Sequence, residues 1–213
     1  IIVEAPLGSR TKLTLPDGTL VWLNAGSRIT YSQGFGVGNR KIELIGEGYF
    51  EVKRNEEVPF LVKTNSLLVK VLGTKFNFRD YPDDAEAVVS LSEGKVSLNN
   101  LLKKEKEAFL LPNERVVLNK KNGRMHVEYS TVSNALQWTN GYLFFDEELL
   151  PDVVKGLERS YNVKIQIASD TLNTFRFYGN FVHREQNIQE VLEALSATRK
   201  IHYIIEGHNI TLY

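Results

Sequence analysis

The sequence contains no cysteine, carries no net charge and has no long apolar run. Without cysteine, disulfide bonds, thiolate metal ligands and cysteine nucleophiles are all excluded. Lys and Arg together number 26, as do Asp and Glu, so the basic excess that is typical of nucleic-acid-binding proteins is absent. Because no run reaches about 18 apolar residues, no segment is expected to cross a membrane as a helix.

The composition is that of an ordinary globular protein. Apolar residues make up 42% and charged residues 24% of the 213 positions, which is enough for one large domain or two modest ones. The first residues, Ile1 to Pro6, lack the basic start and apolar core of a signal peptide. We therefore interpret this terminus as a cut end, such as one just after a leader or a membrane helix.

From about residue 9 to residue 129, short runs alternate between apolar and polar residues. Such alternation indicates strands that bury one face. The apolar pairs two positions apart include Leu13/Leu15, Val21/Leu23, Phe60/Val62, Phe76/Phe78, Val96/Leu98 and Val116/Leu118. With turn signals about every 8–12 residues, this pattern predicts an all-β domain over residues 1–129, built as a jelly roll, a sandwich or a solenoid.

Asn122-Gly123 gives the clearest hairpin signal of this region. The pair lies between two apolar runs, and Asn-Gly suits a type I′ turn because both central residues need a positive φ. We expect a hairpin with that turn.

After residue 140 the apolar period becomes helical. One predicted helix has its apolar face at Val153, Val154, Leu157 and Tyr161, and the other at Ile188, Val191, Leu192 and Leu195. Asn187 and Glu190 stand where a capping box would begin the second helix.

The two helical segments belong to an internal repeat. A shift of 38 residues aligns Gly141 with Gly179, Leu143 with Phe181 and Leu157 with Leu195. Each copy is predicted as strand, helix, strand, and a last strand follows over residues 209–213. The sequence thus predicts a small α+β domain with a duplicated βαβ plan (βαββαββ) over residues 140–213, joined by a connector at residues 130–139.

Catalytic and metal-binding patterns are weak. The four histidines, His126, His183, His202 and His208, show no metal-ligand spacing. No serine has a nucleophile-elbow motif, and Gly34-Phe35-Gly36-Val37-Gly38 lacks the helix and Lys-Ser/Thr of a phosphate loop. We expect no enzyme, no cofactor, no metal and no small-molecule substrate, although two distant carboxylates on a β scaffold could still form a glycosidase site.

A series of phrases in the first domain resembles the FecR family of anti-sigma regulators. In order they are TLPDGT (14–19), VWLNAGS (21–27), RKIEL (40–44), GEGYFEV (46–52), PFLVKT (59–64), VLGTKFNF (71–78) and SEGKV (92–96). The second domain resembles the module that often follows FecR domains, through Trp138-x-x-Gly141 and the helix ending at Tyr161. Its plan is similar to the short domain of secretins and TonB-dependent transporters.

The resemblance implies a regulator that signals across a membrane. Such a protein has a cytoplasmic segment that binds an extracytoplasmic-function (ECF) sigma factor, one helix through the inner membrane, and a periplasmic part. The periplasmic part senses the signalling domain of an outer-membrane TonB-dependent transporter. This chain matches only the periplasmic part, so the sigma factor would bind through a segment that is absent here.

Two strands are candidates for contact with the transporter. Strand addition to an exposed edge is a common mode of recognition, and exposed aromatic residues often anchor interfaces. The candidate edges are residues 175–182 and 209–213, which supply Phe175, Phe177, Tyr178, Asn209, Thr211 and Tyr213.

Some members of the family are thought to cleave themselves at a Gly-Thr bond, and Gly73-Thr74 occupies the matching phrase. The simpler interpretation is that glycine allows a bend and threonine begins the next strand.

The competing function is a jelly-roll carbohydrate-binding protein, for which only Trp22 and Trp138 could supply tryptophan platforms.

Overall fold

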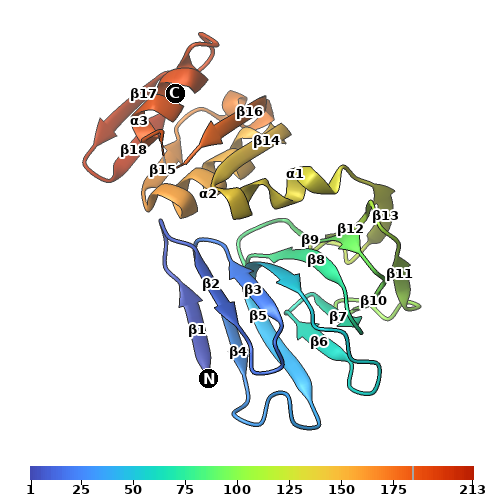
Figure 1. The fold of residues 1–213 in the computed structure, drawn as a ribbon. Coiled ribbons are helices and arrows are strands. Elements are labelled where there is room, and N and C mark those ends of the chain that lie inside the picture. Colours follow the sequence, from blue (N-terminus) through green and yellow to red (C-terminus); the bar gives the residue numbers. More distant parts are fainter. Residues whose placement is uncertain (184) are drawn as a thin grey trace. The chain divides into compact units, whose positions relative to one another are not determined.

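The computed structural model describes residues 1–183 and 185–213 (Figure 1). The chain divides into two compact units, one comprising Ile1–Pro6 and Arg10–Leu136 and the other Leu7–Ser9 and Gln137–Tyr213. Among the described residues, no helix is both long enough and apolar enough to cross a membrane. An all-β part followed by a small α+β part is what the sequence predicts, and this fold class is confirmed.

Unit 1 is built from strands that are mostly antiparallel. They are β1 (Ile2–Ala5), β2 (Thr11–Thr14), β3 (Leu20–Leu23), β4 (Ser27–Tyr31), β5 (Arg40–Glu51), β6 (Phe60–Lys63), β7 (Leu67–Val71), β8 (Lys75–Asp80), β9 (Glu86–Glu93), β10 (Val96–Asn100), β11 (Ala108–Leu110), β12 (Glu114–Asn119) and β13 (Met125–Tyr129). A short helix, α1 (Val132–Leu136), ends the unit.

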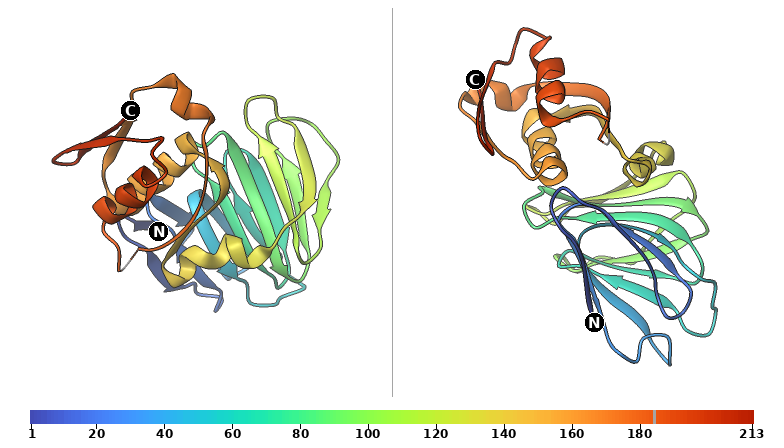
Figure 2. Two further views of the ribbon diagram at one scale, coloured as in Figure 1. Left: turned by 90° about the horizontal axis from the view of Figure 1, so that it is seen from above. Right: turned by 60° about the vertical axis from the view of Figure 1, so that its left-hand side comes forward.

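These strands form one 13-stranded sheet that folds over into two layers and nearly closes (Figure 2). One layer contains β1, β4, β6, β7, β10 and β11, and the other contains β2, β3, β8, β9, β12 and β13. Strand β5 belongs to both, because its first half pairs with β4 and β6 and its second half pairs with β3 and β8. Of the architectures that the sequence left open, the sandwich describes this unit best.

Gly46 marks the point where β5 passes between the two layers. Its φ is +95°, a conformation that side-chain-bearing residues rarely adopt. A Cβ at this position would lie 2.5 Å from Ser27 Oγ and 2.9 Å from Ser27 Cα. Only glycine can therefore hold this backbone conformation against β4.

The inner faces of the two layers supply one apolar core. Phe50, Phe60, Phe76 and Phe78 are fully buried in it, and the rings of Phe50 and Phe76 stack with their centroids 5.1 Å apart. Every apolar pair that the sequence analysis placed on a buried face has at least one member in this core, and Leu13 packs against its edge.

A buried ion pair fastens the loop between β5 and β6. Arg40 Nη1 lies 3.2 Å from Asp17 Oδ2, and both side chains are almost fully buried. Arg40 also donates hydrogen bonds to three carbonyl groups of this loop, those of Lys53, Asn55 and Val58. The Pro16-Asp17-Gly18 turn is thereby tied to a loop that lies more than thirty residues later in the chain.

The hairpin predicted at Asn122-Gly123 is confirmed as the pairing of β12 with β13, but its turn is not type I′. Gly123 has a φ of +68°, whereas Asn122 is not among the residues with positive φ. The amide of Asn119 donates to the carbonyl of Arg124, so the loop is longer than two residues. The Asn122 side chain instead accepts a hydrogen bond from the Arg124 amide at 2.9 Å.

The described residues of unit 2 form two sheets and two amphipathic helices. Its elements are η1 (Gln137–Asn140), β14 (Tyr142–Leu149), α2 (Leu150–Tyr161), β15 (Lys164–Ile167), η2 (Asp170–Thr174), β16 (Arg176–Val182), α3 (Ile188–Ser196), β17 (Tyr203–Glu206) and β18 (Asn209–Leu212).

The helical predictions are confirmed. Val153, Val154 and Leu157 of α2 are buried, as are Val191 and Leu192 of α3. The Asn187 side chain accepts from the Glu190 amide at 3.0 Å, and the Glu190 carboxylate accepts from the Asn187 amide at 2.7 Å. This reciprocal pair is the expected capping box.

Strand pairing in unit 2 differs from the simplest expectation for βαβ units. The order strand, helix, strand is present twice, but the two strands of each copy lie in different sheets. β14 pairs antiparallel with β16, and β15, β18 and β17 form the other sheet in that order. In the first sheet Leu143 pairs directly with Phe181, its counterpart in the 38-residue repeat.

We expect Gly46→Ala to lower the free energy of unfolding by about 3 kcal/mol or more, because a positive φ costs about 1–2 kcal/mol and overpacking about 1–3. Gly18→Ala is the matched control, since Gly18 also has a positive φ, +86°, but nothing lies within 4 Å of its Cβ position. Urea unfolding of both variants measures the difference. Equal losses would show that the contact with Ser27 is unimportant.

We expect Arg40→Met to lower the free energy of unfolding by about 3–5 kcal/mol, because the Asp17 carboxylate would remain buried without its cation. Arg54→Met is the control, because it removes an ion pair with Glu56 in which both side chains are largely exposed. Its free energy of unfolding should change by no more than about 0.5 kcal/mol. Thermal unfolding of the two variants gives the comparison. A small effect of Arg40→Met would mean that the network does not fasten the loop.

Candidate functional site

The two sheets of unit 2 each have one face in the core and one face in solvent. Helix α2 contacts strands of both sheets, and both helices contribute to a single apolar core. Alternation along the strands places Leu143 and Phe145 of β14, and Ile210 and Leu212 of β18, in that core. Residues between them point outward, and these outward residues are the candidates for binding a partner.

The predicted aromatic contacts on residues 175–182 divide between the core and the surface. Phe177 is 9% exposed and belongs to the core, so its prediction as a partner contact is wrong. Phe175 packs against the edge of the core, and Lys200 Nζ lies 5.5 Å from its ring centroid. Tyr178 is 72% exposed, and its ring meets that of Phe144 edge-on at 5.9 Å. Of these aromatic residues, Tyr178 is the most exposed.

Strand β18 is not an edge strand. It pairs in parallel with β15 on one side and antiparallel with β17 on the other, so its backbone hydrogen-bonding groups are occupied. The hypothesis of strand addition to residues 209–213 is therefore wrong. Its side chains remain available, since Asn209, Thr211 and Tyr213 all point to the outer face of the sheet.

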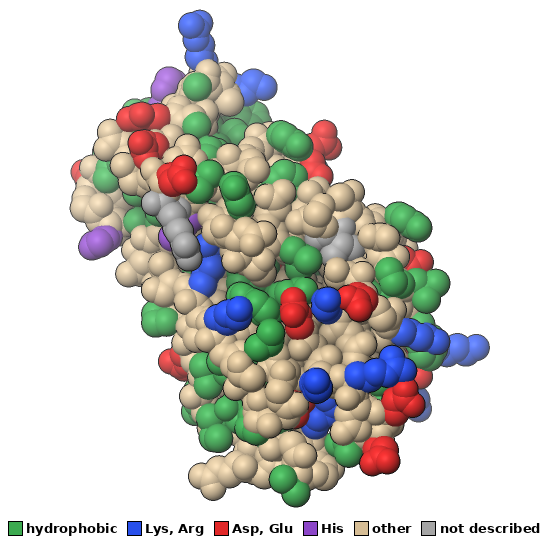
Figure 3. Space-filling view, viewed as in Figure 1, with side chains coloured by type: hydrophobic (Ala, Val, Ile, Leu, Met, Phe, Trp, Pro, Cys, Tyr) green, Lys and Arg blue, Asp and Glu red, His purple; other side chains and the backbone are tan. Residues whose placement is uncertain are grey.

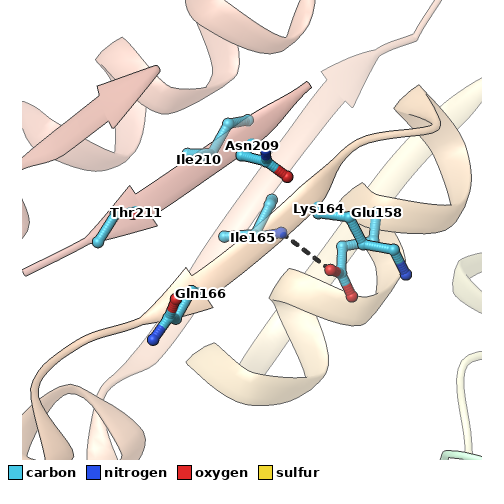
Figure 4. A pocket seen from close by; sticks show the side chains of 7 residues that line it. All are labelled: Glu158, Lys164, Ile165, Gln166, Asn209, Ile210 and Thr211. Atoms are coloured by element: carbon cyan, nitrogen blue, oxygen red, sulfur yellow. Dashed lines mark hydrogen bonds between the residues drawn. The ribbon is translucent and has the colours of Figure 1, made fainter. Parts of the chain in front are cut away.

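A shallow pocket lies at this sheet (Figure 4). Asn209 and Thr211 of β18 line it together with Lys164 and Gln166 of the neighbouring β15. Sequence analysis missed Lys164 and Gln166, although their alternation with Ile165 and Ile167 was a signal that they face outward.

Glu158 borders the same pocket from α2 and protects the sheet edge. Its Oε1 accepts a hydrogen bond from the Ile165 amide at 2.9 Å (Figure 4). That amide points away from β18, because the flanking amides, such as that of Lys164, donate to β18. The carboxylate therefore occupies a donor that an added strand would need.

Among the described residues, only the end of the β16 edge has backbone partners on the side away from β14. The outward amide of Val182 donates to Gln186 Oε1 at 2.8 Å, and the Val182 carbonyl accepts from the amides of Glu185 and Gln186. Asn180 and Tyr178 precede this closed end, and both side chains are exposed. The predicted edge at residues 175–182 is thus an edge, with its accessible part at Tyr178 and Asn180.

Charge on the molecular surface is mixed in sign. Figure 3 shows lysine and arginine side chains interspersed with aspartate and glutamate, without a continuous basic stripe on the face in view. Ion pairs such as Lys75–Glu93 and Arg115–Glu128 join neighbouring strands of unit 1. The guanidinium of Arg115 holds the pKa of Glu128 below its usual value.

Both tryptophans pack against other parts of the protein. Trp138 is buried in η1. Trp22 packs against Tyr49, with ring centroids 5.3 Å apart, and Lys12 Nζ lies 4.5 Å from the indole centroid. Burial and the neighbouring Glu51 raise the pKa of Tyr49 above its usual value, so this phenol stays neutral. The burial of Trp138 and the Lys12 ammonium over the Trp22 ring do not favour either residue as a platform for a sugar ring.

Glu47 and His183 are engaged in local contacts. Glu47 accepts hydrogen bonds from the amide groups of Asn24 and Asn77, at 2.8 and 2.9 Å. His183 Nε2 lies 2.6 Å from the Ser160 carbonyl oxygen. Across the described residues, no three His, Asp or Glu side chains form a group that could hold a metal ion.

The Gly73-Thr74 bond lies in a crowded part of unit 1. Thr74 is 4% exposed, and its hydroxyl donates to the carbonyl of Lys95 at 3.1 Å. A Cβ at Gly73 would lie 2.7 Å from Arg54 Cβ, so glycine is required here for close packing. Because the hydroxyl donates to a carbonyl and not to a base, the contacts favour the simpler interpretation of a bend followed by a strand.

We expect the purified chain to keep its mass of 24.3 kDa during prolonged incubation at neutral pH. Mass spectrometry checks this, with Thr74→Ala as the control that lacks the hydroxyl. The prediction would be contradicted if the native chain, but not Thr74→Ala, gave two fragments, one ending at residue 73 and the other beginning at residue 74.

The comparisons with known proteins agree for both units. A family model described as FecR protein matches residues 2–97, and a model described as FecR, C-terminal matches residues 142–212. Two crystal structures of a candidate anti-sigma factor from Parabacteroides distasonis ATCC 8503, at 1.65 and 2.50 Å resolution, are similar to this chain. Both are 33% identical to it, with TM-scores of 0.92 and 0.91, and the matches cover 100% of this chain and 98% of the other. No curated protein matches the sequence.

The family models together match most of the chain, and the similar structures extend over all of it. The phrases from Thr14 to Val96 and the module that begins near Trp138 predicted this relationship, and it is confirmed. The chain belongs to the FecR family of anti-sigma factors.

Proposed function

We propose that this chain is the periplasmic sensor of an anti-sigma factor anchored in the inner membrane by a single helix. It relays the state of an outer-membrane TonB-dependent transporter to an ECF sigma factor, which binds through a cytoplasmic segment outside these residues. Membership of the FecR family supports the anti-sigma role. The accessible edge of β16 in the FecR C-terminal unit is the observation that carries the choice of a protein partner.

The transporter's signalling domain binds at β16 in this proposal. Tyr178 and Asn180 lie before the end of the strand that Gln186 closes, and their backbone groups on the side away from β14 can receive an added strand. The exposed Tyr178 ring provides an aromatic anchor beside Phe144. Tyrosine at such a position is a frequent hot spot of protein interfaces.

Signal relay requires that the transporter domain bind one state of the sensor better than another, because a partner with equal affinity for both shifts nothing. Binding is the only chemistry that this role demands of the chain. The absence of a metal cluster among the described side chains, and the local engagement of Glu47 and His183, are compatible with such a role.

We expect Tyr178→Ala to weaken binding of the purified transporter signalling domain by about tenfold or more, the usual effect of removing an aromatic hot spot. Tyr129→Ala is the matched control, because Tyr129 is an 82% exposed tyrosine on the edge strand β13 of unit 1. Isothermal titration calorimetry gives both affinities. Equal affinities for the two variants would remove β16 from the proposal.

A second variant tests the backbone contribution. Asn180→Pro removes an amide that points away from β14, so the native sheet keeps its hydrogen bonds while an added strand loses one. Failure of every chain, the native one included, to bind the signalling domain would overturn the proposed function itself.

A further inference from the structure

Strand β17 presents an unprotected edge. Within the described part of the chain it pairs with β18 alone, and the reciprocal hydrogen bonds between His202 and Tyr213, at 2.9 and 3.0 Å, fix which residues face β18. By alternation Ile204 and Glu206 also face β18, whereas the N–H and C=O groups of Tyr203 and Ile205 point to the free side. Among the described residues outside this sheet, none bonds to the backbone of Tyr203 or Ile205.

The side chains along this edge are apolar and exposed. Ile204 is 50% exposed and Ile205 is 38% exposed, and both lie on the strand at the edge of the sheet. The other edges described above have local protection, at β15 from Glu158 and at β16 from Gln186. Figure 2 shows the β17–β18 hairpin extending from the rest of its unit, so a further strand has room to approach. An open, apolar edge of this kind invites pairing with another strand.

The edge is complementary to itself. In an antiparallel pairing of two β17 strands centred on Ile204, Tyr203 of each copy lies opposite Ile205 of the other and both pairs close with reciprocal hydrogen bonds. Ile204 then meets Ile204 of the second copy. On the same face, Glu206 lies opposite His202 of the second copy, which joins a carboxylate to a group able to carry positive charge.

The other registers fit less well. Centring the pair on Ile205 places the Glu206 carboxylate opposite the apolar Ile204. Centring it on Tyr203 places Ile205 beside Ile201, whose side chain is fully buried within its own unit. The register centred on Ile204 therefore joins apolar residues to apolar residues and places each Glu206 carboxylate opposite an imidazole.

We propose that a second copy of this chain pairs with β17 to form a two-fold dimer whose sheets are continuous, with Ile204 on the symmetry axis. Such an isologous contact closes on itself and hides both edges. The inference goes beyond the proposed sensor function and does not depend on it, because the dimer needs no transporter and leaves the edge of β16 unoccupied.

Single-cysteine cross-linking tests the register directly, since the native chain has no cysteine. Residues opposite each other in a non-hydrogen-bonded antiparallel pair have Cα atoms about 4.5 Å apart, which a disulfide can bridge. Ile204→Cys should give a covalent dimer under mild oxidation. Thr211→Cys is the control, because Thr211 pairs with Ile204 on the same face but would lie about 14 Å from its counterpart, three strand spacings away.

Sedimentation equilibrium of the full chain tests the backbone contacts. Ile205→Pro removes an outward amide from both copies without breaking a bond to β18, so the dimer dissociation constant should rise about tenfold or more. Ile205→Val keeps both the amide and the branched side chain and should dimerise like the native chain. Circular dichroism confirms that each variant is folded.

Charge exchange supplies a test that does not involve proline. Glu206→Lys should weaken the dimer, because it puts a cation in place of the carboxylate opposite His202. Adding His202→Glu should restore it, because the two substituted residues carry opposite charges across the axis. A chain that stays monomeric up to millimolar concentration, with no more cross-linking at residue 204 than at residue 211, would overturn the proposal. So would an Ile205→Pro variant that dimerises normally, or one that loses only transporter binding.

Discussion

The close approach of β5 to β4 at Gly46 is the constraint on which unit 1 depends. A single strand can belong to two sheet layers only if its backbone turns where the layers separate, and at Gly46 that turn needs a positive φ and no side chain. The halves of β5 on either side then pair with four different strands. Because the layers are joined through one continuous strand, the core between them is assembled around it.

Buried polar groups fix the positions of loops and strands that the apolar core alone does not specify. The Arg40 side chain satisfies three backbone carbonyls and the Asp17 carboxylate at once, which fixes the loop after β5 against the first turn of the domain. Glu47 plays a similar part, held by Asn24, which directly follows β3, and by Asn77 of β8. Such groups are costly to bury without partners, so their complete pairing favours one arrangement of loops and strands.

Unit 2 is built differently from unit 1. Its two helices and two small sheets share one core, which leaves the outer faces and edges of the sheets for contacts. Glu158 and Gln186 close parts of two edges, whereas no described residue protects the edge of β17 in this way. Edges that remain open are where backbone hydrogen bonding can recruit another chain. Open edges of this kind suit a protein of the anti-sigma family, to which the chain belongs.

The sequence alone determined the change from two-residue to helical periodicity, the apolar faces of both helices, the capping box at Asn187 and the family. Periodicity and capping depend on residues that are a few positions apart in the sequence. The family is recognised from short motifs that occur in a fixed order. The tertiary structure decided which strands pair, because pairing joins residues that are distant in the chain. It showed that β18 lies between the second strands of the two repeats, that Phe177 is buried while Tyr178 is exposed, and that β5 serves both layers at Gly46. Alternation tells which residues share a face, but only long-range pairing and packing settle which face meets the core and which edge is left open.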